Sequence, residues 1–104
     1  MSIYLYFEPD ATDAQIHKAR EFLVGLGYKQ HPTMDTSYLG KKDIITLGPD
    51  KHLIQLNFND DNVKYQERYQ HIIDEFRRIF RVSSYATDFD QPCELNLEGL
   101  VRKK

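Results

Sequence analysis

The fold is decided by residues 53–81, LIQLNFNDDNVKYQERYQHIIDEFRRIFR, where a strand pattern passes directly into a helix pattern. In residues 53–59, Ile54, Leu56 and Phe58 fall on one face and most polar side chains fall on the other, as in an antiparallel strand with one solvated side. In residues 61–81, apolar side chains recur every three or four positions, which indicates a helix. This helical stripe comprises Tyr65, Tyr69, Ile72, Phe76, Ile79 and Phe80. The stretch therefore predicts a sheet strand followed by an amphipathic helix.

The N-terminal part of the chain repeats this succession. Residues 3–8 alternate between two faces and predict a strand. One face carries Ile3, Leu5 and Phe7, and the other carries Tyr4, Tyr6 and Glu8. Residues 12–26 predict a helix, in which Thr12 and Gln15 form a capping box and Gly27 provides a left-handed cap.

Two further segments complete the predicted sheet. Residues 43–47 are predicted to pair with residues 53–59 as a hairpin around the turn Gly48-Pro49-Asp50. Residues 94–98 are predicted as the last strand, with Leu95 and Leu97 facing the core. Residues 83–92 are predicted as a polar loop, whereas residues 28–42 fit either short strands or an irregular edge.

The order strand–helix–strand–strand–helix–strand predicts an α+β fold. We expect one domain over residues 1–104, because a chain of this length can bury one modest core. Its single, mainly antiparallel sheet is expected to have four or five strands in ferredoxin-like order, with two helices packed on one face. The other face of such a sheet is left open for a partner.

Composition narrows the class of partner and the compartment. The 14 basic and 16 acidic side chains give a formal net charge of −2, which argues against broad binding to nucleic acid. The cluster Arg102, Lys103 and Lys104 is predicted to be solvated. Cys93 is the single cysteine, so no internal disulfide can form and a reducing cytoplasm is expected. No apolar stretch is long enough for a membrane span, and no signal peptide is recognised.

The sequence contains no specific catalytic or cofactor motif. Two pairs at helical spacing, His17–Glu21 and His71–Glu75, lie away from the apolar stripes and are predicted to be solvated charge pairs rather than metal ligands. The five glycines are scattered and form neither a phosphate loop nor a dinucleotide turn. We therefore expect no catalytic residue, metal or cofactor, and a non-enzymatic protein is favoured over an enzyme.

The candidate partner-binding residues combine aromatic rings with acids and amides, as protein interfaces do. Some belong to the open faces of the first and last predicted strands, and the others belong to the loop between residues 83 and 92. Together they are Tyr4, Tyr6, Glu8, Tyr85, Asp88, Phe89, Asp90, Glu94, Asn96 and Glu98. The alternative interpretation is that Tyr4 and Tyr6 are ordinary strand formers and that the loop is an ordinary surface turn.

The chain resembles two kinds of known protein, one in a short stretch of sequence and one in expected shape. Residues 19–28, AREFLVGLGY, resemble the passage from helix to strand in a glyoxalase-type βαβββ module and cover about a tenth of the chain. That resemblance implies metal ligands on strand positions, where His52 or Glu8 is available. By shape alone, the expected domain is similar to bacterial immunity proteins and antitoxins, which block a toxin by covering its site.

Three functions follow from these patterns. The first is a non-enzymatic protein-binding module, such as an immunity- or antitoxin-like inhibitor of a cationic protein. The alternative is a small ligand-binding domain or enzyme of glyoxalase-like or ferredoxin-like architecture. The third is RNA binding on the open face, which the expected acids and the lack of nearby basic residues oppose. The expected partner is a basic protein, with a homodimer left open.

Overall fold

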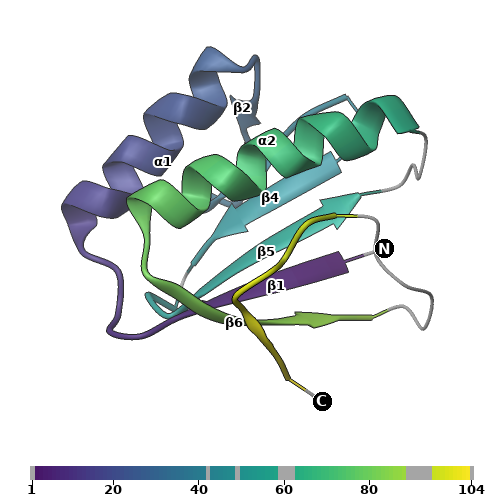
Figure 1. Ribbon diagram of the computed structural model, residues 1–104. Coiled ribbons are helices and arrows are strands. Elements are labelled where there is room, and N and C mark those ends of the chain that lie inside the picture. Colours follow the sequence, from purple (N-terminus) through teal and green to yellow (C-terminus); the bar gives the residue numbers. More distant parts are fainter. Residues whose placement is uncertain (1, 42, 49, 59–62, 89–94, 104) are drawn as a thin grey trace.

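The computed structural model describes residues 2–41, 43–48, 50–58, 63–88 and 95–103 (Figure 1). These residues form two helices and one mixed, mostly antiparallel sheet of seven strands. In chain order the elements are β1 (Ser2–Phe7), α1 (Asp13–Gly25), β2 (Lys29–Gln30), β3 (Ser37–Leu39), β4 (Asp43–Leu47), β5 (Leu53–Phe58), α2 (Val63–Ile79), β6 (Val82–Thr87) and β7 (Val101–Arg102). The predicted α+β class is confirmed, whereas the predicted count of four or five strands is wrong.

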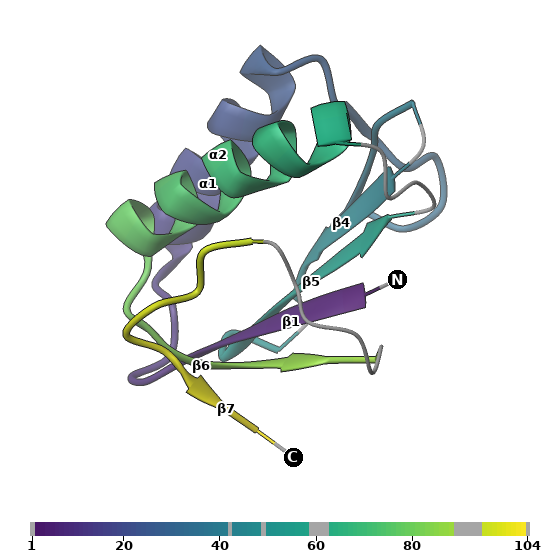
Figure 2. The same cartoon turned by 45° about the vertical axis from the view of Figure 1, so that its right-hand side comes forward.

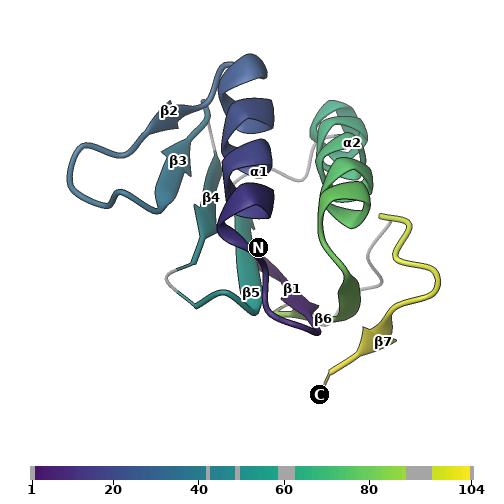
Figure 3. The same ribbon diagram turned by 90° about the vertical axis from the view of Figure 1, so that its left-hand side faces the viewer.

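The strands lie in the order β2-β3-β4-β5-β1-β6-β7. Neighbours are antiparallel except for β6 and β7, which are parallel. The first strand lies in the interior of the sheet, where Tyr4 is opposite Gln55 on β5 and Ala86 on β6. Both helices lie side by side across one face of this sheet (Figure 3).

The core lies between this helical layer and the sheet. Ile3 and Leu5 of β1, like Ile54 and Leu56 of β5, are fully buried, which confirms the predicted alternation. The stripe of α2 is confirmed at Tyr69, Ile72, Phe76 and Phe80, and Ile73 is buried beside it. Stacking of Phe7 on Phe80, with ring centroids 4.6 Å apart, joins β1 to the residue that follows α2. Within the described parts of the chain, no helix is long and apolar enough to cross a membrane.

The capping box of α1 is formed as predicted. The Gln15 backbone N–H donates to Thr12 Oγ1 at 3.2 Å, and the Thr12 N–H donates to Gln15 Oε1 at 2.8 Å. Gly27 has a φ of 97° and follows the end of the helix, as its predicted cap role requires. These bonds satisfy donors that the first turn of a helix leaves without partners.

Replacing Thr12 by alanine is expected to lower the free energy of unfolding by about 1 kcal/mol, because the Gln15 N–H loses its acceptor. Urea denaturation followed by circular dichroism measures this change. Thr33→Ala, in the exposed loop between β2 and β3, is the control for an ordinary threonine substitution. Equal losses in the two variants would contradict a specific capping role.

Two segments correct the sequence interpretation, and a third decides between the alternatives that it left open. Residues 82–87, predicted in part as a polar loop, form strand β6, and residues 95–98, predicted as a strand, do not form one. Leu95 and Leu97 are nevertheless buried, as expected from their spacing. Residues 28–42 contain two short strands, β2 and β3, which form one edge of the sheet.

Candidate functional site

The face of the sheet away from the helices is the candidate site. Strand alternation and register place the same side of every strand on this surface, which we call the open sheet face. Its members are Lys29, Ser37, Leu39, Ile44, Thr46, Leu53, Gln55, Asn57, Tyr4, Tyr6, Ser84, Ala86, Val101 and Lys103. Most side chains of the central strands are half-buried, as expected on a sheet surface without a covering layer.

Tyr6 is the aromatic residue of this face that contacts a positively charged side chain. It lies between Leu53 on β5 and Ser84 on β6, and the Lys103 ammonium lies 4.1 Å from its ring centroid. The Lys103 backbone N–H donates to the Tyr85 carbonyl at 2.7 Å, which positions this lysine directly after β7. The arrangement is a cation–π contact between the ring and the ammonium.

Charge is placed at the borders of the open sheet face. Its members named above include no carboxylate, and their two charged residues, Lys29 and Lys103, belong to opposite edges of the sheet. Glu8 follows β1, and Asp88 follows β6 at the other end of the β1–β6 ladder. Asp88 Oδ1 accepts a hydrogen bond from the Ser2 N–H at 2.7 Å, and this bond lowers the pKa of the Asp88 carboxyl. Asp88 is therefore ionised at neutral pH.

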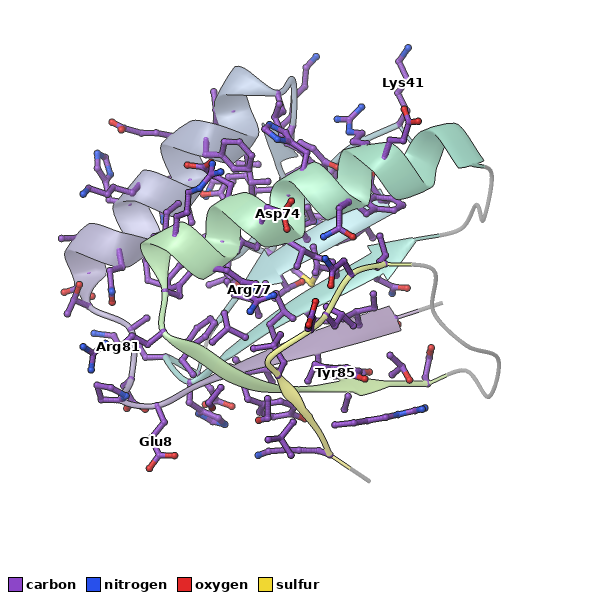
Figure 4. The ribbon with its side chains drawn as sticks, viewed as in Figure 1. Glu8, Lys41, Asp74, Arg77, Arg81 and Tyr85 are labelled. Carbon is purple, nitrogen blue, oxygen red and sulfur yellow. The ribbon has the colours of Figure 1, made fainter. Side chains whose placement is uncertain are left out.

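The structure places four of the predicted partner-binding residues at or beside this face. Tyr4 and Tyr6 lie on it, while Glu8 and Asp88 are exposed at the two ends of the β1–β6 ladder. Glu8 points away from the sheet (Figure 4). Phe89, Asp90 and Glu94 lie outside the described residues, as does Cys93.

The predicted positions of Tyr85, Asn96 and Glu98 are wrong. Tyr85 pairs with Leu5, so it lies on the helix side of β6, partly buried against the core. Residues 95–100 run between α2 and β6 instead of joining the sheet (Figure 2). Alternation alone suggested a strand there, because it cannot reveal whether the backbone has a strand to pair with.

Side chains of α2 hold the segment 95–100 in place. The Gln70 amide donates to the Asn96 carbonyl at 3.1 Å and accepts a bond from the Asn96 N–H, while Arg77 donates to the Glu98 carbonyl at 2.9 Å. Leu95 and Leu97 contribute to the core. The segment therefore covers part of the helix side and leaves the open sheet face uncovered by residues 95–100.

A polar cluster is buried on the helix side. The Tyr28 hydroxyl donates to Asp43 Oδ2, and the Arg68 guanidinium carbon lies 4.9 Å from the Tyr28 ring centroid. Tyr28 and Asp43 are 2% and 5% exposed. A Cβ on Gly40 would lie 2.8 Å from Tyr28 Cε2, so the cluster needs glycine there. Burial, and then the neighbouring Asp43, raise the pKa of Tyr28 above its ordinary value of 10.0. This cluster connects the end of α1, β4 and α2.

The histidine pairs do not build a metal centre. His17 Nε2 lies 2.9 Å from Glu21 Oε1, and both side chains are exposed, as predicted for a solvated pair. The predicted His71–Glu75 pair is not the one formed, because Glu75 Oε2 accepts a hydrogen bond from Arg78 at 2.9 Å. His71 is exposed and packs edge-on against Phe22. His52 and Glu8, the strand positions considered for a glyoxalase-like site, are both exposed. Across the described ranges, no three His, Cys, Asp or Glu side chains are grouped to hold a metal ion.

No family model, curated protein or solved structure matches this chain. The candidate site is therefore defined by its geometry and chemistry.

Proposed function

We propose that this chain is a non-enzymatic protein-binding module and that the open sheet face receives its partner. The observation that carries the proposal is a continuous sheet surface that no described segment covers, opposite a face that two helices and residues 95–100 cover (Figures 2 and 3). Tyr4, Tyr6 and Leu53 lie in its middle beside the amides of Gln55 and Asn57, and Glu8 and Asp88 lie at its ends. Tyrosines are enriched at protein interfaces, where they combine apolar area with a polar group.

The finer part of the proposal is an immunity- or antitoxin-like inhibitor that covers a site on a basic protein. Glu8 and Asp88 would attract such a partner during association. We place the protein in the reducing cytoplasm, since its single cysteine fits that compartment. We also propose a ferredoxin-like arrangement for β1, α1, β4, β5, α2 and β6. The pairing of β1 with both β5 and β6 supports this arrangement, and β2, β3 and β7 are additional strands at the two edges of the sheet.

Capture of the partner from the native host, followed by affinity measurement with the purified partner, tests this proposal. Tyr4→Ala and Tyr6→Ala are each expected to weaken binding by about 2 kcal/mol, or roughly thirtyfold, mainly through faster dissociation. Arg20→Ala, at an exposed position on α1, is the control from the opposite side of the molecule. Circular dichroism establishes that each variant is folded. A partner that binds both folded tyrosine variants at full strength would place the interface elsewhere.

Neutralising the two border carboxylates tests the basic character of the partner. The double variant Glu8→Gln and Asp88→Asn is expected to slow association and to flatten its dependence on salt, because exposed charges act mainly through long-range attraction. Stopped-flow or surface-based kinetics at several salt concentrations measure both effects. An association rate that rises in the double variant would indicate an acidic partner.

RNA binding is the second candidate function for the same face. The observation that favours it is Lys103 beside Tyr6, with Tyr4 two residues away on the same side of β1. Tyrosine rings can stack on bases, and a neighbouring lysine can contact phosphate.

A further inference from the structure

We infer that Tyr6 is a cation-binding position that Lys103 fills in the free chain, and that the partner supplies a lysine or arginine side chain which replaces Lys103. The inference rests on the proposed function and adds the chemistry of the partner at one position. The occupant is thus a protein segment with a basic side chain that reaches Tyr6, near the end of the β1–β6 ladder that Glu8 follows.

The ring of Tyr6 already holds a cation. The Lys103 Nζ lies 4.1 Å from the ring centroid, within the range of about 6 Å over which cation–π attraction operates. Tyr6 is half-buried between β5 and β6, so the neighbouring strands fix its position. The ring therefore presents a prepared surface for a positive charge.

Lys103 is suited to being displaced. It is exposed, and the bond from its backbone N–H to the Tyr85 carbonyl holds the main chain without using the ammonium. The long lysine stem can therefore swing away while β7 stays paired with β6. A lysine side chain loses rotamer freedom when its ammonium is held on a ring, and a side chain that a structured partner already holds in place loses less.

The surrounding charges favour a cation from outside. Glu8 and Asp88 lie at opposite ends of the ladder that contains Tyr6, and the members of the open sheet face carry no carboxylate to bind Lys103. Release of Lys103 also removes a positive charge from this position. Arg102, which bonds Thr87, adds a positive charge at the Asp88 end, so Glu8, two positions from Tyr6, is the acid that a basic segment meets beside the ring.

Lys103→Met gives opposite results for the two classes of partner, because it removes the resident cation but keeps a similar stem. The probes are a polyarginine peptide and a single-stranded oligouridine RNA, each titrated at low salt by NMR with the backbone amide signals of β1 and β6 as the readout, which every variant keeps. We expect Lys103→Met to strengthen binding of the peptide by about two- to fivefold. Tyr6→Leu is expected to weaken binding of the same peptide.

Lys29→Met is the matched control, since it removes the same charge from the opposite edge of the open sheet face. A specific effect requires a larger gain from Lys103→Met than from Lys29→Met. Equal gains in peptide affinity from the two variants would show general charge repulsion and overturn the inference. A peptide that does not bind at all would also overturn it. If the RNA binds and Lys103→Met weakens that binding, the inference is overturned in favour of nucleic acid. The comparison of the two lysine variants remains decisive if Tyr6→Leu does not fold.

Failure of the inference can be separated from failure of the proposed function. If Tyr4→Ala disrupts binding to the partner captured from the host but Lys103→Met does not strengthen it, the open sheet face is the interface and the cation exchange is wrong. If neither tyrosine truncation affects that partner, the proposed function itself fails.

Discussion

Replacing Phe76 by alanine is expected to lower the free energy of unfolding by about 3–5 kcal/mol, the range for truncating a buried phenylalanine. The Phe76 side chain is 0% exposed and meets Phe22 and Phe80 edge-on, with centroid distances of 6.1 and 6.0 Å. Truncation removes both ring contacts and leaves a cavity where α1, α2 and the sheet meet. A domain with a total stability of about 5–15 kcal/mol would lose a large part of it.

Urea denaturation of the wild type, Phe76→Ala and Ile72→Ala measures this effect, with about 2–5 kcal/mol expected for Ile72→Ala. Val24→Ala is the matched control, because Val24 lies on α1 and is 56% exposed. Its effect should stay within about 0.5 kcal/mol. Losses below that value at both Phe76 and Ile72 would contradict the packing of α2 described above.

Replacing Tyr28 by phenylalanine is expected to destabilise the fold by about 1–3 kcal/mol, because the buried Asp43 carboxylate loses the hydroxyl that donates to it. We expect a loss in the upper part of that range, because Asp43, which is only 5% exposed, would keep a buried carboxylate without this hydrogen-bond donor. Tyr4→Phe is the control on the half-buried open sheet face. Similar losses at the two tyrosines would contradict a special role for the buried cluster.

The same residue predicts a loss of stability in alkaline solution. The pKa of Tyr28 is raised in the folded chain, so below pH 10 both the folded and unfolded states keep its proton and its full contribution to stability is present. Above pH 10 the unfolded chain releases the proton first, and stability falls by up to about 1.4 kcal/mol per pH unit until the folded pKa is reached. The wild type should therefore lose stability more steeply than Tyr28→Phe between pH 10 and 11. Parallel curves would contradict the raised pKa.

The parts of the fold that the sequence predicts well are those in which burial follows a clear period. Ile3 and Leu5 alternate with half-buried tyrosines, and the stripes of both helices face the core. Strand β6 was missed because its sequence, VSSYAT, carries few apolar side chains. It is a strand because β1 lies beside it and pairs with its backbone, which is a tertiary cause that local patterns do not contain.

The candidate site was predicted only on β1 and β5, where alternation is clear. Tyr4 and Tyr6 were found because alternation assigns them to the face opposite Ile3 and Leu5. The contacts of Arg102 with Thr87 and of Lys103 with Tyr6 had no signal in the sequence, where these residues form a solvated basic cluster. They arise because β7 pairs with β6, a strand that was itself missed. The contacts of Arg102 and Lys103 could be predicted only once β6 had been recognised as a strand.

The interior position of β1 makes completion of the sheet a late event during protein synthesis. Ser2 and its hydrogen-bond partner Asn57 are 55 positions apart, and Ser2 and Asp88 are 86 positions apart. The ribosome therefore releases the hydrophobic and aromatic strand SIYLYF long before either neighbouring strand exists. Until then both edges of β1 can pair with another nascent chain, so protection by chaperones matters most for this first segment.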